Sequence, residues 1–246
     1  MSVSLRATVK PWIDGAAQIA VLTGAGMSAE SGVPTFRDAL TGLWAQFNPE
    51  ELATEAAFRA HPKRVWDWYA ERRAALTTVE PNAGHRALAA FAKRHPGRLT
   101  LMTQNVDGLH QRAGHGDAIA LHGNIAQDQW LDTPRACCQP AAVAAGQPPR
   151  CAVCGNLRRP AVVWFGEPLP AAALAAAEAA ARGCDLMLVV GTAGVVYPAA
   201  GLALTAHQCG ARVVIINPDT TDLDPVADLC LREPAAQCLP LLLELP

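Results

Sequence analysis

The stretch that decides the fold runs from Ile19 to Ala29 and is Ile-Ala-Val-Leu-Thr-Gly-Ala-Gly-Met-Ser-Ala. Its first four residues form an apolar run that is typical of a buried parallel strand. The turn that follows matches the pattern G-x-G-x-x-A, in which small residues let the backbone approach a pyrophosphate at the start of a helix. The stretch therefore predicts a strand, a tight turn and a nucleotide site at the end of the strand.

Two features separate this turn from the one found in hydride-transfer enzymes. Ser31-Gly32-Val33-Pro34 ends the following helix almost at once. No second strand with a terminal acid follows about 20 residues later to hold the adenosine ribose. The turn favours a nucleotide and disfavours an ordinary dehydrogenase, and a tight turn without any ligand is the simpler alternative.

Working outward, three more apolar runs predict strands, at Leu99–Met102, Leu186–Val190 and Val213–Ile216. Helical segments are expected between them, from Asn82 as an N-cap to about His95 and in the Ala-rich residues 170–182. Strands that alternate with helices indicate an α/β fold with a doubly wound, Rossmann-like parallel sheet. Such sheets bind ligands beyond the carboxyl ends of their strands.

Composition narrows the function classes. The 246 residues include 20 Lys and Arg against 22 Asp and Glu, a net charge of −2, so we expect no nucleic-acid partner. We see no signal-peptide core and no 18-residue apolar stretch, which predicts no membrane partner and a cytoplasmic protein. In that compartment the eight cysteines are expected to be free thiols or metal ligands.

Two stretches do not follow the strand–helix alternation. Residues 36–73 are polar with a helical pattern, and residues 124–159 are rich in proline and contain half of the cysteines. We expect them to form a small discontinuous lobe, part helical and part cysteine-rich. Residues 1–35, 74–123 and 160–246 would then form the Rossmann-like nucleotide domain.

Six motifs, in order along the chain, resemble those of the sirtuins, the NAD-dependent protein lysine deacylases. They are Gly24–Arg37, Thr103–His110, Leu121–Asn124, Val162–Glu167, Gly191-Thr192 and Asn217-Pro218. The resemblance implies that NAD is a consumed co-substrate. It also implies that acylated-lysine proteins or peptides are the partners, and that nicotinamide and O-acyl-ADP-ribose are products.

The same resemblance implies roles for individual residues. His122 would be the general base, and an imidazole suits that role at neutral pH. Asp107 and Asn105 would line the nicotinamide pocket, Phe36 would shield the reactive ribose carbon from water, and Arg37 would organise the phosphates. The implied NAD-binding residues are Gly24, Ala25, Gly26, Ser28, Phe36, Arg37, Gln104, Asn105, Asp107, Gly191, Thr192, Asn217 and Cys230.

The resemblance also implies residues that bind the adenosine end of NAD and residues that bind the peptide. Asn217, after the last expected strand, would bind the adenosine ribose. Cys230 would neighbour the adenine or lie in the core. A peptide would add as a strand between residues 163–167 and 194–197, with Val163, Trp164, Phe165 and Gly166 as its binding residues.

Tyr69 and Arg72 are three residues apart, which places them on one face of the expected helix. The motif Tyr-x-x-Arg resembles that of the sirtuin subgroup that prefers succinyl and malonyl groups. A phenol and a guanidinium can together hold the terminal carboxylate of such an acyl group. A solvated helix face is the simpler alternative.

The resemblance also implies a structural zinc site in the lobe, because the family usually holds one Zn²⁺ with two C-x-x-C pairs, but the spacing of the cysteines here is irregular. Cys151 and Cys154 form a C-x-x-C pair, whereas Cys137 and Cys138 are adjacent, and neighbouring residues rarely ligate one tetrahedral ion comfortably. Three alternatives are open. Both adjacent thiols bind through a bent loop, or one binds with water, Asp128 or Asp132, or the zinc is lost.

The other histidines are not expected to take part in catalysis. His85 is expected at a helix start and His110 in the ordering of the loop after Asp107, and we expect four on the surface: His61, His95, His115 and His207. The alternative functions are a sirtuin-like mono-ADP-ribosyltransferase, a non-catalytic NAD-binding module and, less favoured, a dehydrogenase.

Overall fold

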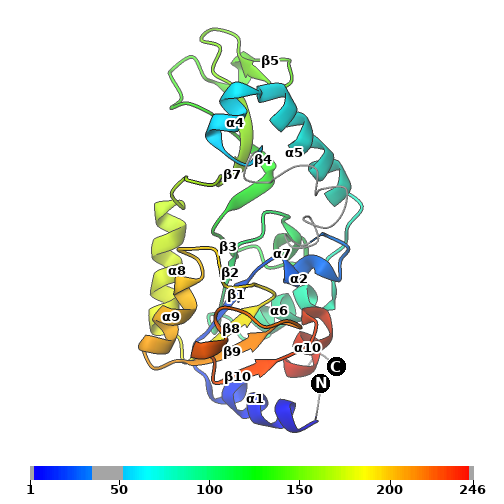
Figure 1. The fold of residues 1–246 in the computed structure, drawn as a ribbon, viewed down its shortest axis with the longest axis vertical. Coiled ribbons are helices and arrows are strands. Elements are labelled where there is room, and N and C mark those ends of the chain that lie inside the picture. The colour runs from blue at the N-terminus through cyan, green and yellow to red at the C-terminus, as the bar shows by residue number, and fades with distance from the viewer. Residues whose placement is uncertain (1–2, 35–51, 244–246) are drawn as a thin grey trace.

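The computed structural model describes residues 3–34 and 52–243, which form an elongated molecule with a sheet at one end and a lobe at the other (Figure 1). The sheet has six parallel strands in the order β10-β9-β8-β1-β2-β3. Their bounds are β1 Ile19–Thr23, β2 Leu99–Thr103, β3 Ile119–Ala120, β8 Leu186–Val190, β9 Arg212–Ile216 and β10 Leu229–Leu231. The parallel, Rossmann-like sheet expected from the sequence is therefore confirmed.

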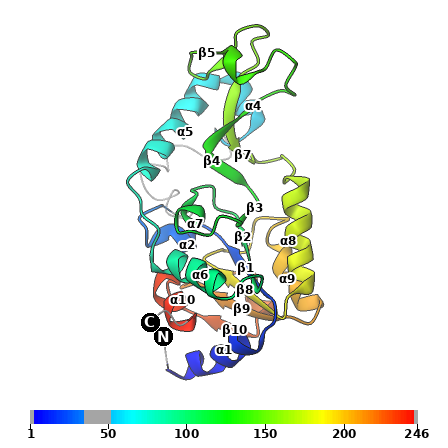
Figure 2. The same cartoon turned by 180° about the vertical axis from the view of Figure 1, so that it is seen from behind.

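The side chains of β1 point alternately to the two faces of the sheet, and each face is covered by a layer of helices. Ile19 and Val21 enter one apolar core, whereas Ala20 and Leu22 enter the other. The first core is completed by α1 (Val3–Gly15), α6 (Ala83–Arg94) and α10 (Ala235–Leu242), and the second by α8 (Ala171–Gly183) and α9 (Gly201–Gln208). Figure 2 shows α8 and α9 on the opposite side of the sheet from α6 and α10. Both strand faces are covered, which explains their near-continuous apolar sequence.

Two strands and one helix of the sheet domain have little signal in the sequence. The strands β3 and β10 have two and three residues, too short to stand out as apolar runs. Helix α1 contains Pro11 and many polar residues, so its sequence lacks a clear helical signal. The strand before Asn217 is therefore not the last of the sheet, because β10 comes after it.

Helix α6 begins as expected. The Asn82 side chain accepts hydrogen bonds from the backbone N–H groups of Gly84 and His85, at 2.9 and 3.2 Å. The His85 ring in turn accepts from the Asn82 backbone N–H at 3.3 Å, which completes a capping box. The helix-start role of His85 is confirmed.

The lobe combines helices α4 (Glu55–Ala60) and α5 (Pro62–Leu76) with an antiparallel pair, β4 (Gly123–Trp130) and β7 (Arg158–Val162). A second small pair joins β5 (Val143–Ala144) to β6 (Arg150–Cys151). The lobe has its own apolar core, whose fully enclosed members are Leu52, Phe58, Val65, Tyr69, Ile125, Val162 and Trp164. Helix α5 and strand β7 thus extend past residues 73 and 159, where the sequence suggested the lobe segments would end.

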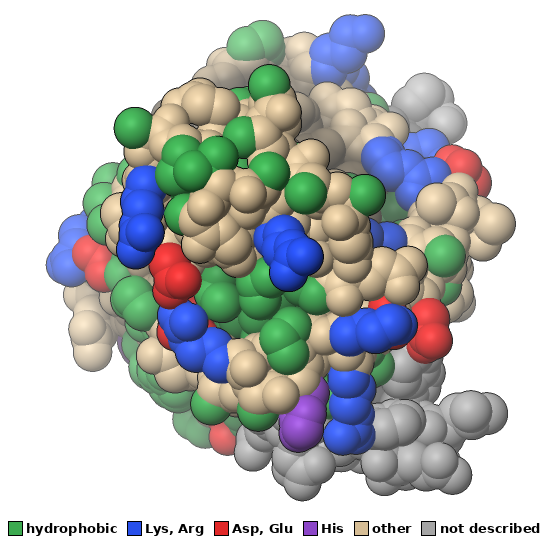
Figure 3. Space-filling view, turned by 90° about the horizontal axis from the view of Figure 1, so that it is seen from above, with side chains coloured by type: hydrophobic (Ala, Val, Ile, Leu, Met, Phe, Trp, Pro, Cys, Tyr) green, Lys and Arg blue, Asp and Glu red, His purple; other side chains and the backbone are tan. Residues whose placement is uncertain are grey.

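The remaining short elements are α2 (Gly26–Ala29), α7 (Leu109–Arg112) and the 3-10 turns η3 (Pro140–Ala142) and η4 (Asp224–Val226). In the part of the chain that the structure describes, no helix is both long and apolar enough to span a bilayer. Seen from the lobe end, Lys and Arg side chains are scattered over the surface and several lie beside acidic groups (Figure 3).

Candidate functional site

The strands of the sheet end at one common edge. Thr23, the last residue of β1, is paired with Thr103 of β2 and with Val190 of β8, and Val190 is paired with Ile216 of β9. The loops that follow these strands carry most of the residues that the sequence suggested for NAD. One edge therefore gathers segments that are far apart in the chain.

Glycines lock the first turn onto the loop after β8. A Cβ on Gly24 would lie 2.7 Å from Thr192 Cβ, and one on Gly26 would lie 2.8 Å from Gly191 Cα. Gly191 itself has a φ of +62°, and a Cβ there would collide with the Met27 backbone N. Close packing of the two loops, and not only access for a pyrophosphate, thus requires glycine here. Sequence reasoning missed this second role.

A buried polar network lies beneath the glycine turn. The fully buried Ser28 donates a 2.7 Å hydrogen bond to Asp107 Oδ2. Asn105 Nδ2 donates to Ser28 Oγ at 3.1 Å and to the Gly24 carbonyl at 3.0 Å. Burial raises the pKa of Asp107, while the bonds from Ser28 and from the Leu109 N–H oppose that rise. Ser28, Asn105 and Asp107 form one connected group.

His122 follows β3 at the same edge, and its ring orientation is defined by one contact. Nδ1 lies 3.0 Å from the Gln104 carbonyl oxygen. Because a carbonyl only accepts, Nδ1 carries the proton and Nε2 of the neutral ring has a lone pair available for a proton. Burial lowers the pKa of His122, and the Gln104 contact partly opposes this, so the neutral, proton-accepting form is favoured near pH 7.

Two of the side chains expected to bind NAD donate hydrogen bonds to Thr192. Asn217 Nδ2 donates to the Thr192 carbonyl at 3.0 Å, and Gln104 Nε2 donates to Thr192 Oγ1 at 3.2 Å. Cys230 lies within β10, partly buried, and burial is the main cause that raises its pKa. Cys230 therefore packs at the margin of the second apolar core.

Three further histidines are buried near this edge. His110 Nε2 lies 3.0 Å from Thr23 Oγ1, and its ring centroid is 4.7 Å from that of His85. The expectation that His115 lies on the surface is wrong, because the residue is only 3% exposed. The turn after α7 folds its ring inward, with Nδ1 2.9 Å from Asp117 Oδ1.

The suggested acyl pocket lies in the core of the lobe. Tyr69, which is 5% exposed, accepts a 3.0 Å hydrogen bond at Oη from Trp164 Nε1. Burial raises the pKa of Tyr69 to about 12 and lowers that of Arg72 to about 10. At neutral pH the phenol therefore keeps its proton and the guanidinium keeps its charge, as carboxylate recognition requires.

The segment suggested for peptide binding links this pocket to the sheet edge. Val163 donates its backbone N–H to the His122 carbonyl at 2.9 Å. The Trp164 backbone N–H donates to Glu167 Oε2 at 2.8 Å, and Glu167 forms an ion pair with Arg159. Gly166, next in the segment, has a φ of +85°.

Apolar side chains are exposed on both segments expected to flank the peptide. Phe165 is 44% exposed on the first segment, and Tyr197 is 63% exposed on the second, together with Val195 and Val196. Exposed apolar groups of this size are a common feature of interaction surfaces. Both segments thus carry exposed apolar side chains that a bound peptide could cover.

The four cysteines of the lobe converge at its tip. All four Sγ atoms, from Cys137, Cys138, Cys151 and Cys154, lie within 4.8 Å of one another. Tetrahedral zinc with Zn–S bonds of about 2.3 Å separates its sulfur ligands by about 3.8 Å, so the geometry fits that ion. The backbone N–H of Cys154 lowers the pKa of Cys151 to about 7, which favours the thiolate that zinc binds.

This geometry favours the first of the three alternatives, in which both adjacent thiols bind. The two acids considered as substitutes are engaged elsewhere. Asp128 pairs with Arg73 and Asp132 pairs with Arg59, at 2.5 and 2.6 Å. The whole cluster thus supplies four sulfur ligands, the donor set of a closed structural site.

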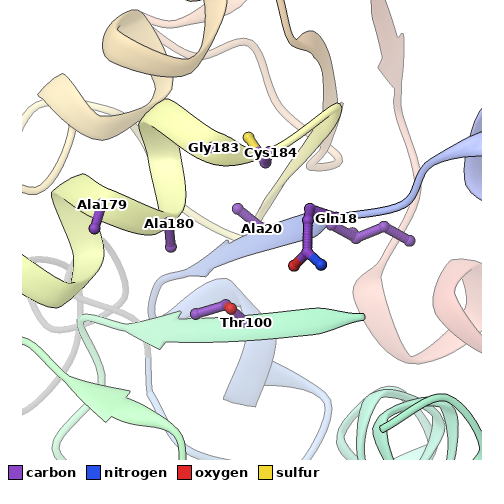
Figure 4. A pocket seen from close by; sticks show the side chains of 8 residues that line it. Gln18, Ala20, Thr100, Ala179, Ala180, Gly183 and Cys184 are labelled. Atoms are coloured by element: carbon purple, nitrogen blue, oxygen red, sulfur yellow. The ribbon is translucent and has the colours of Figure 1, made fainter. Parts of the chain in front are cut away.

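Phe36 and Arg37 lie outside the described residues. Two of the cavities among the described residues lie away from the carboxyl ends of the strands. One, of about 620 Å³, borders α5 in the lobe, and its lining includes Trp68. The other, of about 250 Å³, lies between α8 and the opposite, amino ends of β1 and β2 (Figure 4).

The sequence and the structure were both compared with those of known proteins. The model of the Sir2 family matches residues 24–198. A relative from Ralstonia nicotianae, named NAD-dependent protein deacylase, is 58% identical over 239 residues, 96% of this chain and 95% of the relative. The crystal structure of a Sir2 homolog–NAD complex has a TM-score of 0.86 and 42% identity, and covers 96% of this chain and 92% of that one. A Sir2–p53 peptide–NAD+ structure has a TM-score of 0.79 and 31% identity, and covers 93% of each chain.

Proposed function

This chain belongs to the Sir2 family, and we propose that it is an NAD-dependent protein lysine deacylase. In the proposed reaction, the acyl group of a modified lysine is transferred to ADP-ribose and nicotinamide is released. The observation that carries the proposal is the orientation of His122. Its Nδ1–H is engaged by the Gln104 carbonyl, which leaves Nε2 free to accept a proton at the strand ends.

The network beneath the glycine turn has a role in this proposal. Ser28, Asn105 and Asp107 hold one another by hydrogen bonds of 2.7 and 3.1 Å. We propose that these groups bind and orient the nicotinamide end of NAD, while the loops containing Gly191 and Asn217 hold the phosphates and the adenosine ribose. A site already held in shape loses little entropy when the substrate binds.

We further propose that acidic acyl groups, succinyl and malonyl, are preferred substrates alongside acetyl. Tyr69 presents a protonated phenol, and Arg72 presents a guanidinium in the same partly buried region. Hydrogen bonds to a charged group contribute about 1.5–3 kcal/mol each. This supports a selectivity of about 10- to 150-fold between acyl groups with and without a terminal carboxylate.

The two parts of the chain have separate tasks in this proposal. Residues 1–35, 74–123 and 160–246 bind NAD, and the lobe of residues 36–73 and 124–159 selects the acyl group. The cluster of four cysteines holds a structural zinc that maintains the lobe. None of the eight cysteines forms a disulfide, which is consistent with the proposed action in the cytoplasm.

One experiment tests the proposal and its alternatives. The purified chain is incubated with NAD and matched acetyl-, succinyl- and malonyl-lysine peptides, and the products are identified by mass. Nicotinamide together with acylated ADP-ribose is the expected result. ADP-ribose attached to protein indicates a transferase, NAD binding without turnover indicates a sensor module, and absorbance from reduced cofactor indicates hydride transfer.

A further inference from the structure

One tryptophan of helix α5 contacts both residues of the suggested acyl pocket. The Arg72 guanidinium carbon lies 3.6 Å from the Trp68 ring centroid. The same ring meets Tyr69 edge-on, with centroids 4.7 Å apart and an interplanar angle of 85°. Trp68 and Arg72 are four residues apart, so the helix itself aligns the ring with the cation.

The contact between Trp68 and Arg72 compensates for the partial burial of a positive charge. Burial lowers the pKa of Arg72 to about 10, while nearby Tyr69 and Glu71 act in the opposite direction. A guanidinium taken from water needs compensation. The face of an indole is the best aromatic partner for such a cation, and its attraction is strongest where water is excluded.

The polar atom of Trp68 is not used to anchor the ring. Its Nε1 is buried and has no hydrogen-bond partner among the described residues. The ring also borders the cavity of about 620 Å³ on α5. The ring packs against the apolar core of the lobe and also contacts Tyr69 and Arg72. It therefore joins the core to both polar residues of the suggested acyl pocket.

The neighbouring pair on the same helix provides a contrast. Arg73 lies 5.3 Å from the Trp66 ring centroid, a longer contact of the same kind. Arg73 is fastened to β4 by an ion pair with Asp128 and by hydrogen bonds to the carbonyls of Ile125 and Gln127. The Trp66–Arg73 pair thus joins the helix to the sheet of the lobe and is positioned by β4.

We propose that Trp68 is a positioning residue for acyl selection, because its ring holds the Arg72 guanidinium beside the Tyr69 hydroxyl, where both can donate to one carboxylate. The acyl groups concerned are those of dicarboxylic acids, such as succinyl and malonyl. The inference rests on the acidic-acyl preference proposed above. Trp68 acts through Arg72 and does not itself need to touch the substrate.

The test compares kcat/KM for succinyl- and acetyl-lysine peptides of one sequence in wild type, Trp68→Leu, Trp68→Phe and Trp66→Leu. We expect Trp68→Leu to lower the succinyl-to-acetyl ratio about three- to thirtyfold, the range of a desolvated cation–π contact, through a higher KM for the succinyl peptide. Trp68→Phe retains an aromatic face and should recover most of the ratio. Trp66→Leu, the matched control, should leave the ratio unchanged.

A double-mutant cycle completes the test. In an Arg72→Met background, Trp68→Leu should no longer change the ratio, because the group that it positions is gone. Equal losses in Trp68→Leu and Trp66→Leu, or an undiminished effect in the Arg72→Met background, overturn the inference. Should Trp68→Leu fail to fold, Trp68→Met takes its place, since methionine fills the volume without an aromatic face.

Failure of the inference and failure of the proposed function have different signatures. A wild-type chain that removes acetyl groups but not succinyl groups contradicts the acidic-acyl preference, and the inference falls with it. A wild-type chain that removes succinyl groups, and whose Trp68→Leu variant keeps the wild-type ratio, contradicts only the inference.

Discussion

The edge of the sheet and the tip of the lobe are stabilised in opposite ways. At the sheet edge, β1 pairs with β2 and with β8 over five residues each, and the loops beyond them interlock through Gly24, Gly26 and Gly191. At the lobe tip, β5 and β6 pair over two residues, beside four clustered thiols. Apolar burial therefore accounts for the first region, whereas the second has little secondary structure and four thiols whose geometry fits a stabilising zinc.

The largest effect that separates the two regions is expected from loss of the cysteine cluster. Purified protein should contain one zinc per chain, and Cys154→Ala should abolish it. Structural zinc contributes about 10–16 kcal/mol in small zinc peptides, so the lobe tip should lose its structure while the sheet stays folded. Hydrogen exchange measures this as lost protection in β6 and retained protection in β1 and β8.

The matched control for this variant is Cys209→Ala, because Cys209 is an exposed thiol outside the cluster. It should retain the zinc and the exchange pattern of the wild type. Zinc content far below one per chain in the wild type, or equal loss of protection in both regions of Cys154→Ala, would contradict the contrast between the regions.

The next largest effect belongs to the sheet edge. His122→Ala should lower deacylation about 10²- to 10⁴-fold, the usual contribution of a general base, while zinc content and NAD binding stay near wild type. Nicotinamide release from an acetyl-lysine peptide measures the loss, with His207→Ala on the surface of α9 as control. Because burial lowers the pKa of His122, the acidic limb of kcat/KM in the wild type should have its midpoint below 6.5.

The sequence predicted the sheet edge better than the lobe, for physical reasons. Strands buried on both faces have apolar runs long enough to recognise, whereas the two-residue β3 depends on its neighbour β2. The position of His122 followed from a motif, but its ring orientation depends on the Gln104 carbonyl, 18 residues away in the chain. The burial of His115 likewise depends on how one turn folds.

The lobe was less predictable because its contacts are long-range and its spacing is irregular. Adjacent Cys137 and Cys138 argued against a shared ion, and only the fold of the intervening loops brings both to Cys154. The helical Tyr69–Arg72 spacing was visible in the sequence. The hydrogen bond from Trp164 to Tyr69, across 95 positions, carried no local signal.

A smaller effect should separate selectivity from stability within the lobe. Arg72→Met should lower succinyl removal about 10- to 150-fold more than acetyl removal, because it deletes a charged donor to the acyl carboxylate. Arg73→Met, one residue on, instead deletes the ion pair to Asp128 and should lower the melting temperature without changing the acyl ratio. Equal loss of both activities in Arg72→Met would leave the guanidinium without a role in acyl choice.

The smallest expected effect is a pH dependence of stability at the sheet edge. Buried histidines lie there, and the lobe has none among its described residues. Burial lowers the pKa of His85 to about 4 and that of His110 to about 3, against about 6.5 in the unfolded chain. Below pH 6.5 and above about 4, the unfolded chain therefore binds more protons than the folded one. The free energy of unfolding should fall on acidification by about 1.4 kcal/mol per pH unit for each histidine.

Comparison with a variant isolates this contribution from that of the carboxylates, which titrate in both proteins. Urea unfolding of wild type and His110→Gln at pH 6, 5.5 and 5 should give a slope against pH that is smaller in the variant by about 1.4 kcal/mol per unit. His207→Gln, at an exposed histidine, should keep the wild-type slope. Since the lobe's described histidine, His61, is exposed, hydrogen exchange at pH 5 should show the sheet edge loosening before the lobe. Parallel curves for wild type and His110→Gln would mean that His110 does not remain neutral in the folded protein.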